Sequence, residues 1–324
     1  MAKKPSAGTR PKMAQKTIVS RILEETNQGH TTRADLYRQI EQEIGPGHRV
    51  LSFFTSFFWP VVISDGDADM VEEVLRTTLA SAGDKLVLIL NSPGGDPLAA
   101  ERIVHICRSY SKDGEYIVIV PKMAKSAATM ISLGASEIWM SKTSELGPID
   151  PQIPVKLEGE KRSRYVAAHE IVNSYNELLD KANKTTGQIA PYLQQLQRYD
   201  ARAVQRIISA QQLSEVIAVE TLKTGIMKGQ TDAQIKQKIS AFLDPVVTKV
   251  HGRPVYHDVA KKCGLEIKLQ DSHSALWDAV WELYMRLDHL VGRHTSCKVV
   301  ESAADLYSAA VPSAVIAAMG QNDE

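Results

Sequence analysis

Cysteine is scarce in this sequence, and the few cysteines present are not spaced as a disulfide or zinc framework requires. Three occur in 324 residues, Cys107, Cys263 and Cys297, and no two of them form a C-x-x-C pair. An odd number at wide spacing excludes a disulfide-stapled scaffold and a cysteine-based zinc site. We therefore expect a reducing, cytoplasmic location and no bound metal.

Long apolar runs are also lacking. The most apolar segment, VLSFFTSFFWPVVI at 50–63, has 14 residues and contains Pro60, whereas a membrane-spanning helix needs about 20. It favours a buried strand. The N-terminal segment MAKKPSAGTRPKMAQK is basic, but no apolar stretch of a secretory signal follows it. We interpret it as a disordered basic tail, with weak electrostatic docking as the alternative, and expect no integral membrane segment.

Neither sign of charge is in excess, because Lys plus Arg and Asp plus Glu both number 38. Without a strong positive field, the chain is not expected to bind nucleic acid or an anionic membrane. The glycine patterns G-x-G-x-x-G and Walker A, which cradle dinucleotides and nucleoside triphosphates, are absent as well. The sequence therefore predicts no cofactor and no ATPase activity.

The middle of the chain alternates short apolar runs with amphipathic helical patterns. Strands are predicted at 50–63, 86–90 and 116–121, with helices at 70–83 and 97–110 between them. The unbroken run LVLIL is typical of a strand buried on both faces of a parallel sheet. This alternation predicts a doubly wound α/β fold with right-handed crossovers.

The remainder of the chain is organised differently. The pattern is almost wholly helical between 163 and 243, and 251–271 returns to a loop, a short helix and a strand. In the last helix, 274–292, an apolar stripe suits either a packed terminal helix or an oligomer seam. The stripe is Leu276, Val280, Leu283, Leu287 and Leu290. We predict five segments: a basic tail and N-terminal helices (1–48), an α/β core (49–162), a helical insertion (163–245), a closing segment of the core (246–272) and a C-terminal helix and tail (273–324).

Two glycines directly follow the predicted strand 86–90, in the stretch NSPGGDPLAAERI. Gly94 and Gly95 free the backbone to adopt positive φ, so that amide hydrogens can face a ligand near a helix N-terminus. Such amides can stabilise a developing oxyanion. The same stretch is also compatible with an ordinary tight turn between a strand and a helix.

One serine stands among alanines in KMAKSAATMISLGASEIWMS, where a strand is predicted to end and a helix to begin. Ser126 lies 31 residues beyond Gly95, one βαβ step later, so the two loops are expected at the same carboxyl edge of the sheet. A serine on such a turn exposes its hydroxyl, and the following amide of Ala127 points the same way. Taken alone, the serine also fits a small residue that allows close helix packing.

These stretches, together with SELGPIDPQI, resemble the Clp-fold serine proteinases of the serine dehydrogenase proteinase family and, more distantly, signal peptide peptidase A and the ClpP peptidase. The resemblance is strong over 49–153 and weak over 250–269. It implies a ClpP/crotonase-like fold of repeated β-β-α and βαβ units, hydrolysis of peptide bonds in a peptide or protein substrate, and assembly as a homo-oligomer. It also implies Ser126 as the nucleophile and an oxyanion hole at Gly94, Gly95 and Ala127.

The resemblance leaves three possibilities for the general base. The stretch LGPIDPQI offers Asp150 but no histidine, while His251 in HGRPV resembles a histidine-containing loop of the family. His251 would then take the proton of Ser126 while Asp150 orients the imidazole. Signal peptide peptidases use a lysine instead, for which Lys181 and Lys184 lie at a plausible distance in sequence. The third possibility is that no working base exists.

Two other classes of function remain open on the same fold. A crotonase-type acyl-CoA enzyme shares the oxyanion hole but needs no serine nucleophile. A noncatalytic oligomeric scaffold would keep both loops as fold elements. The histidines His169, His257, His273 and His289 lie in helical or polar contexts and have no partners at metal-ligand spacing; the sequence gives them no role.

Overall fold

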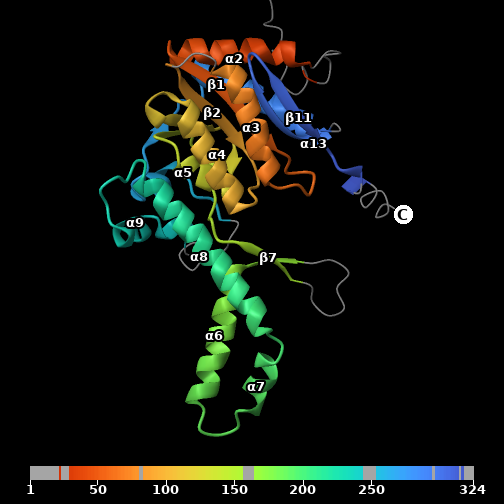
Figure 1. Cartoon of the computed structure of the whole chain (residues 1–324), viewed down its shortest axis with the longest axis vertical. Coiled ribbons are helices and arrows are strands. Elements are labelled where there is room, and N and C mark those ends of the chain that lie inside the picture. Colours follow the sequence, from red (N-terminus) through yellow and green to blue (C-terminus); the bar gives the residue numbers. More distant parts are fainter. Residues whose placement is uncertain are drawn as a thin grey trace, which may run out of the picture.

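A seven-stranded, mostly parallel sheet forms the centre of the protein (Figure 1). The computed structural model describes residues 22, 29–79, 83–155, 164–243, 253–293, 296–313 and 315–316. The strand order is β11-β10-β1-β2-β3-β5-β9, in which only β10 and β11 run antiparallel to their neighbours. The strands are β1 (His48–Thr55), β2 (Lys85–Asn91), β3 (Tyr116–Val120), β5 (Glu137–Met140), β9 (Ile267–Leu269), β10 (Ser296–Ser302) and β11 (Leu306–Ala310).

Helices cover both faces of this sheet, as a doubly wound fold requires. On one face pack α3 (Asp65–Thr78), α4 (Pro97–Tyr110) and α5 (Ala127–Leu133), and on the other α2 (His30–Ile44) and α13 (Ala275–Arg293). The turn η1 (Lys112–Gly114) leads into β3, and α12 (His257–Lys262) leads into β9. The predicted mixed α/β architecture is confirmed.

The first strand is shorter than its apolar sequence suggests. β1 ends at Thr55, because the Ser56 hydroxyl accepts the N–H groups of Phe58 and Trp59 and so turns the chain. Pro60, which has no N–H to donate to a ladder, follows in the same loop. The prediction of a strand over the whole of 50–63 was therefore wrong beyond Thr55.

The segment after Cys297 is part of the core sheet, so the expected C-terminal helix and tail (273–324) was an incomplete description. β10 pairs with β1, and its charged residues are buried against distant partners. Lys298 Nζ lies 2.6 Å from Asp67 Oδ2, and Glu301 receives the guanidinium of Arg33 at 2.6 Å. The sequence did not predict this strand because its charged side chains are typical of a surface segment, and their partners lie on other elements.

The apolar stripe of the last helix is used within the chain. Val280, Leu283 and Leu287 of α13 are fully buried against the sheet and α2. Of the two interpretations left open, the packed terminal helix is confirmed, and the stripe is not available as an oligomer seam.

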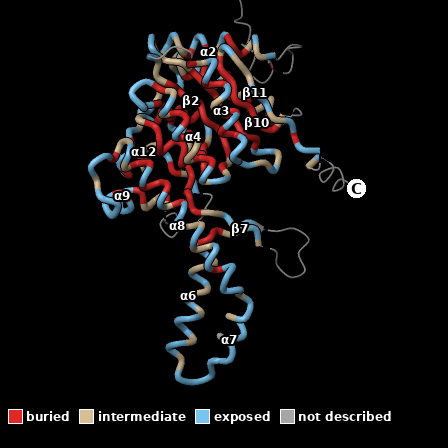
Figure 2. Tube along the Cα trace, viewed as in Figure 1, coloured by how far each residue is buried: buried red, intermediate tan, exposed pale blue. Residues whose placement is uncertain are grey.

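The region predicted as a helical insertion begins with a hairpin and continues as an arm. The hairpin joins β7 (Gln152–Val155) to β8 (Arg164–Ala167), and α6 (Ala168–Lys184), α7 (Ala190–Leu196) and α8 (Ala201–Lys223) follow. The arm projects from the sheet domain and is mostly exposed (Figures 1 and 2). The second half of α8 returns to pack on α4 and α5, and α9 (Asp232–Lys238) and α10 (Ser240–Leu243) complete the region. No helix in the described ranges is long and apolar enough to cross a membrane.

Candidate active site

Ser126 occupies a strained turn between a strand and a helix. After β4 (Met123–Ala124), which pairs with β6 (Glu145–Leu146), the chain reaches Ser126 at the N-cap of α5 with φ 49° and ψ −117°. Such a conformation is unusual for a residue with a side chain and persists only where the surroundings hold it. The backbone bonds from Ala128 N–H to Lys125 O (2.9 Å) and from Met130 N–H to Ser126 O (3.1 Å) fix the turn.

The NSPGG loop lies directly against this serine, as the sequence predicts. A Cβ atom on Gly94 would lie 2.7 Å from the Ser126 Cβ and 2.4 Å from the Lys125 carbonyl oxygen, and Gly94 has φ 97°. A Cβ atom on Gly95 would lie 2.2 Å from the Ile63 carbonyl oxygen. Both positions therefore require glycine, because only glycine permits these close backbone approaches.

Two amide groups at this junction are uncommitted within the described parts of the chain. Ile63 N–H donates to Gly94 O (2.8 Å) and Asp96 N–H to Ile63 O (2.9 Å), which leaves the N–H of Gly95 facing away from Ile63 without an acceptor. The N–H of Ala127, at the first position of α5, also has none there. The Gly94 N–H donates to Ser92 Oγ at 3.1 Å.

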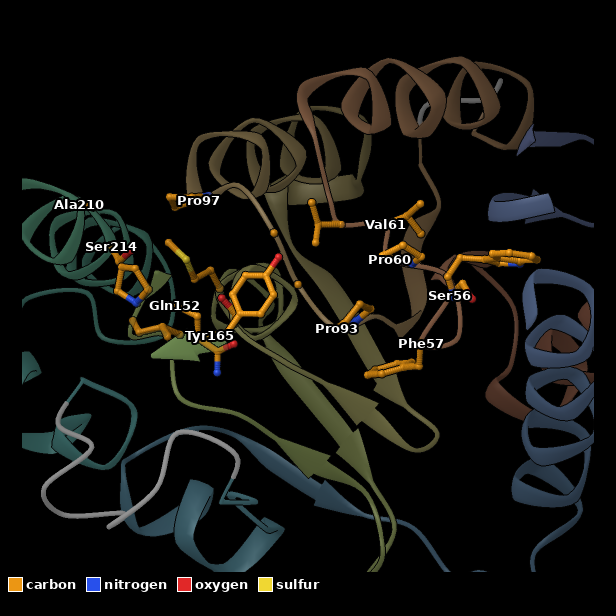
Figure 3. A pocket seen from close by; sticks show the side chains of 18 residues that line it. Ser56, Phe57, Pro60, Val61, Pro93, Pro97, Gln152, Tyr165, Ala210 and Ser214 are labelled. Atoms are coloured by element: carbon orange, nitrogen blue, oxygen red, sulfur yellow. Dashed lines mark hydrogen bonds between the residues drawn. The ribbon is translucent and has the colours of Figure 1, made fainter. Parts of the chain in front are cut away.

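A mostly apolar cleft of about 510 Å³ opens at Ser126. In Figure 3, Gln152, Tyr165 and the α8 residues Ala210 and Ser214 lie on one side, and the loop of Phe57, Pro60 and Val61 lies on the other. Phe57 and Tyr165 stay 42% and 70% exposed at the mouth. The cleft thus lies between the sheet domain and the base of the arm.

Asp150 is paired with His169, a residue that the sequence left without a role. The Asp150 side chain is fully buried, and its Oδ2 lies 3.2 Å from Nδ1 of His169, whose side chain is 13% exposed. Burial raises the pKa of the Asp150 carboxyl, and the neighbouring His169 partly opposes that rise. Ile149 and Pro151 on either side of Asp150 line the Ser126 cleft.

The hairpin explains why these two residues meet. Gln152 of β7 pairs with Ala167 of β8, and Ala168 N–H donates to Pro151 O at 2.8 Å. Asp150 precedes this register by two residues and His169 follows it by two, so their side chains come together across the root of the hairpin. Recognising the antiparallel pairing of 152–155 with 164–167 was the signal that would have found His169.

The other candidate bases are placed less favourably or not described. His251 lies outside the described residues. Lys181 and Lys184 are 58% and 80% exposed, and each pairs with the acidic residue four positions earlier, Glu177 and Asp180. An exposed lysine keeps its hydration, so the structure lends these two no support as a general base.

Lys125, next to Ser126 in the chain, was not considered from the sequence. Burial lowers the pKa of its ammonium group, and Glu145, whose Oε2 lies 3.2 Å from Nζ, partly opposes that shift. Its Nζ is also 3.4 Å from the Leu146 carbonyl oxygen. These contacts tie Lys125 to β6. No group of three or more His, Cys, Asp or Glu among the described residues is placed to hold a metal ion.

Parts of this chain are similar to known proteins in sequence or in structure. Two uncharacterized proteins of Methanocaldococcus jannaschii, MJ0137 and MJ1495, are 42% and 39% identical over 83 residues, which is 25% of this chain and 28% of each relative. Two structures of the 1510-N membrane-bound stomatin-specific protease are 16% identical. A serine-to-alanine mutant covers 65% of this chain and 93% of its own with a TM-score of 0.29. A lysine-to-alanine mutant in complex with a substrate peptide covers 69% and 93% with 0.28.

The family comparison covers the site itself. Residues 61–207 match the model of the ClpP-like SDH-type serine proteinases, and this range includes the NSPGG loop, Ser126, Asp150, His169 and part of α8. The resemblance inferred from the sequence is therefore confirmed over this segment, which is similar to the ClpP-like SDH-type serine proteinases, a family of serine-type peptidases.

Proposed function

We propose that this protein hydrolyses peptide bonds through an acyl-enzyme formed on Ser126. The observation that carries the proposal is the strained turn that presents Ser126 to the NSPGG loop at the floor of an apolar cleft. A strained strand-to-helix turn exposes a nucleophilic hydroxyl, and the family match supports the reaction class.

The oxyanion hole in this proposal is built from backbone amides. The uncommitted N–H groups of Gly95 and Ala127 supply two donors where negative charge develops on the attacked carbonyl oxygen. Gly94 allows the loop to approach Ser126, and its own N–H can join them by leaving the Ser92 hydroxyl that it now contacts.

The general base that the structure supports best is His169, with Asp150 as its orienting partner. An ionised carboxylate only accepts hydrogen bonds, so its contact with Nδ1 places the imidazole proton there and leaves the Nε2 lone pair to take the Ser126 proton. The same imidazole then protonates the leaving amine, and a water molecule hydrolyses the ester. His251 remains the competing prediction, with the same role for Asp150.

The cleft also favours a class of substrate. Its apolar lining, with Phe57 and Tyr165 exposed at the mouth, is suited to an extended peptide with large apolar side chains near the scissile bond. A cleavage profile from a peptide library that prefers charged residues next to the scissile bond would contradict this.

Assembly and location complete the proposal. We expect a homo-oligomer in which the exposed arm supplies the contacts, since apolar side chains of α6 to α8 such as Leu179, Leu193 and Val216 remain exposed. A monomer mass of 35.7 kDa in light scattering at micromolar concentration would contradict it. The three cysteines are free and buried, which suits a cytoplasmic location.

Labelling with a fluorophosphonate probe tests the reaction class. The wild type should acquire an adduct on Ser126 and hydrolyse peptides, while Ser126→Ala should do neither. Absence of an adduct together with thioester binding in the cleft would instead favour a crotonase-type acyl-CoA enzyme. Absence of both would favour the noncatalytic scaffold.

A further inference from the structure

The hydroxyl of Thr129 is fully buried and connects three segments of the site. Thr129 Oγ1 lies 2.8 Å from the Ala124 carbonyl oxygen and 3.0 Å from the Gly147 carbonyl oxygen. It also accepts the Gly147 N–H at 3.0 Å. One side chain therefore shares its proton between two carbonyl groups and satisfies an amide.

The three connected segments all carry parts of the proposed machinery. Thr129 lies three residues after Ser126 on α5, and Ala124 lies two residues before Ser126. Ala124 in turn forms a bridge with Ser92 of the NSPGG loop. Gly147 lies in the buried stretch 146–150, which leads through Ile149 to Asp150. The hydroxyl thus connects the turn of the nucleophile with the segment that ends in the Asp150–His169 pair.

We propose that Thr129 is a positioning residue that sets the separation between Ser126 and the Asp150–His169 pair. This inference rests on the proposed peptidase function. The pairing of β4 with β6 aligns the two segments only as far as Leu146, so beyond that point the Thr129 hydroxyl holds the backbone of Gly147 to the helix of the nucleophile. A shift of about 1 Å between reacting groups can cost a hundredfold in rate.

The residue types of Thr129 and Gly147, which form this contact, both fit the positioning role. Threonine has few accessible χ1 rotamers, so its hydroxyl direction is well defined in a packed site. A Cβ atom on Gly147 would lie 2.7 Å from Lys125 Cδ, so the glycine allows the segment to pass close to the residue before Ser126. The simpler role for Thr129 would be that of a satisfied core hydroxyl that only adds stability.

The test compares Thr129→Val, which keeps the shape and removes the hydroxyl, with Thr129→Ser, which keeps the hydroxyl. Ser132→Ala is the matched control, because Ser132 is equally buried on α5 but its hydroxyl bonds, among the described residues, only to Ala128 O of the same helix. Activity is expressed per folded molecule, measured by denaturant titration. We expect Thr129→Val to lower kcat at least about tenfold with KM changed less than about twofold, because the cleft lining is not altered.

The conservative and control variants define the outcome. Thr129→Ser should retain most of kcat, and Ser132→Ala should leave kcat unchanged even where it lowers stability. Normal kcat per folded molecule in Thr129→Val would show a purely structural hydroxyl and overturn the inference. An equal loss in Ser132→Ala would also overturn it, since helix stability alone would then be the cause.

A double-mutant cycle with Asp150→Asn supplies a second readout, followed by the rate of Ser126 labelling with the fluorophosphonate. If Thr129 acts through the position of Asp150 and His169, the effect of Thr129→Val should shrink in the Asp150→Asn background. Fully additive effects would count against the inference. Failure of the wild type itself to label on Ser126 would instead refute the proposed function, so the two failures are distinguishable.

Discussion

The sheet domain is mostly buried and the arm is mostly exposed, and the residues of the candidate site come from both regions. β2, β3 and α5 are almost entirely buried, and Gly94, Gly95 and Ser126 lie in the loops next to them. In α6, which carries His169, only Ala168 is buried. Core packing therefore fixes Ser126 and the proposed oxyanion amides, whereas His169, the proposed base, lies at the root of an exposed hairpin. The comparison predicts that mutations of Gly94 and Gly95 act through geometry, whereas those of Asp150 and His169 at the root of the hairpin act through chemistry.

The largest effect is expected at the nucleophile. Ser126→Ala should reduce peptide hydrolysis by on the order of 10⁴-fold or more, because the variant lacks the oxygen that attacks the carbonyl carbon in the proposed mechanism. The unfolding free energy of the variant should stay close to that of the wild type, because the substitution removes a single oxygen atom that faces the cleft. Peptidase assays and denaturant titration measure both. Substantial turnover in this variant would reject Ser126 as the nucleophile.

On the arm side, His169→Ala should be almost as damaging as the loss of the serine, because members of a triad act as a unit. Steady-state rates of peptide hydrolysis by the histidine variants measure this. His251→Ala is the decisive comparison. If His251→Ala is inactive while His169→Ala retains the wild-type rate, the base belongs to the segment around 251 instead.

Gly95→Ala should lower turnover by about 10²- to 10³-fold, the cost of one oxyanion donor. The added Cβ would lie 2.2 Å from the Ile63 carbonyl oxygen, so the loop must move and its amide with it. Gly66→Ala on α3 is a matched control, because a Cβ there meets nothing within 4 Å. Steady-state kinetics on both variants separates loop geometry from a general intolerance of alanine, and normal turnover in Gly95→Ala would remove this loop from the mechanism.

Asp150→Asn should separate activity from stability. Burial raises the pKa of Asp150 in the folded protein above its ordinary value of 3.8. The folded state therefore holds this proton more tightly than the unfolded state, and the stability contributed by the group is lost as pH rises through the folded pKa. Asparagine does not titrate, so the unfolding free energy of the variant relative to wild type should increase from acid to neutral pH. The variant should nevertheless be less active than wild type. Chemical denaturation across that pH range measures this, and a relative stability that decreases instead would show that the ionised carboxylate stabilises the fold.

The smallest effects are expected along the arm. Lys181→Ala and Lys184→Ala each remove an exposed ion pair on α6, which typically contributes about 0.3–0.5 kcal/mol. Activity should be unchanged. An inactive variant at either position would move the base to a lysine and break the division between a rigid sheet side and a chemically active hairpin root.

The sequence predicted the sheet side of the site well because its signals are local. The two glycines follow an unbroken apolar strand, and the serine lies at a strand end one βαβ unit later. This spacing predicts that the two loops share an edge of the sheet, and the structure places Gly94 against Ser126 accordingly. The resemblance to a known family added the reaction class. Neither inference required knowledge of contacts between distant residues.

The parts that were missed depend on partners far apart in the chain. Asp150 meets His169 only through the register of a hairpin whose strands are four residues each and not clearly apolar. β10 was missed because Lys298 and Glu301 look like surface residues until Asp67 and Arg33 are seen to neutralise them. Burial of charge is a property of the pair, so single positions cannot reveal it.

The pairing of β1 with β10 also bears on how the chain folds as it is synthesised. Leu51 lies opposite Ser302, so β1 emerges from the ribosome long before the strand that covers one of its edges. Until β10 arrives, the edge of a strand carrying Phe53 and Phe54 is open to pairing with other chains. Pairings between such distant segments form slowly, so nascent or truncated chains that lack β10 are expected to aggregate and to depend on chaperones, although the loops of Gly94, Gly95 and Ser126 are already complete.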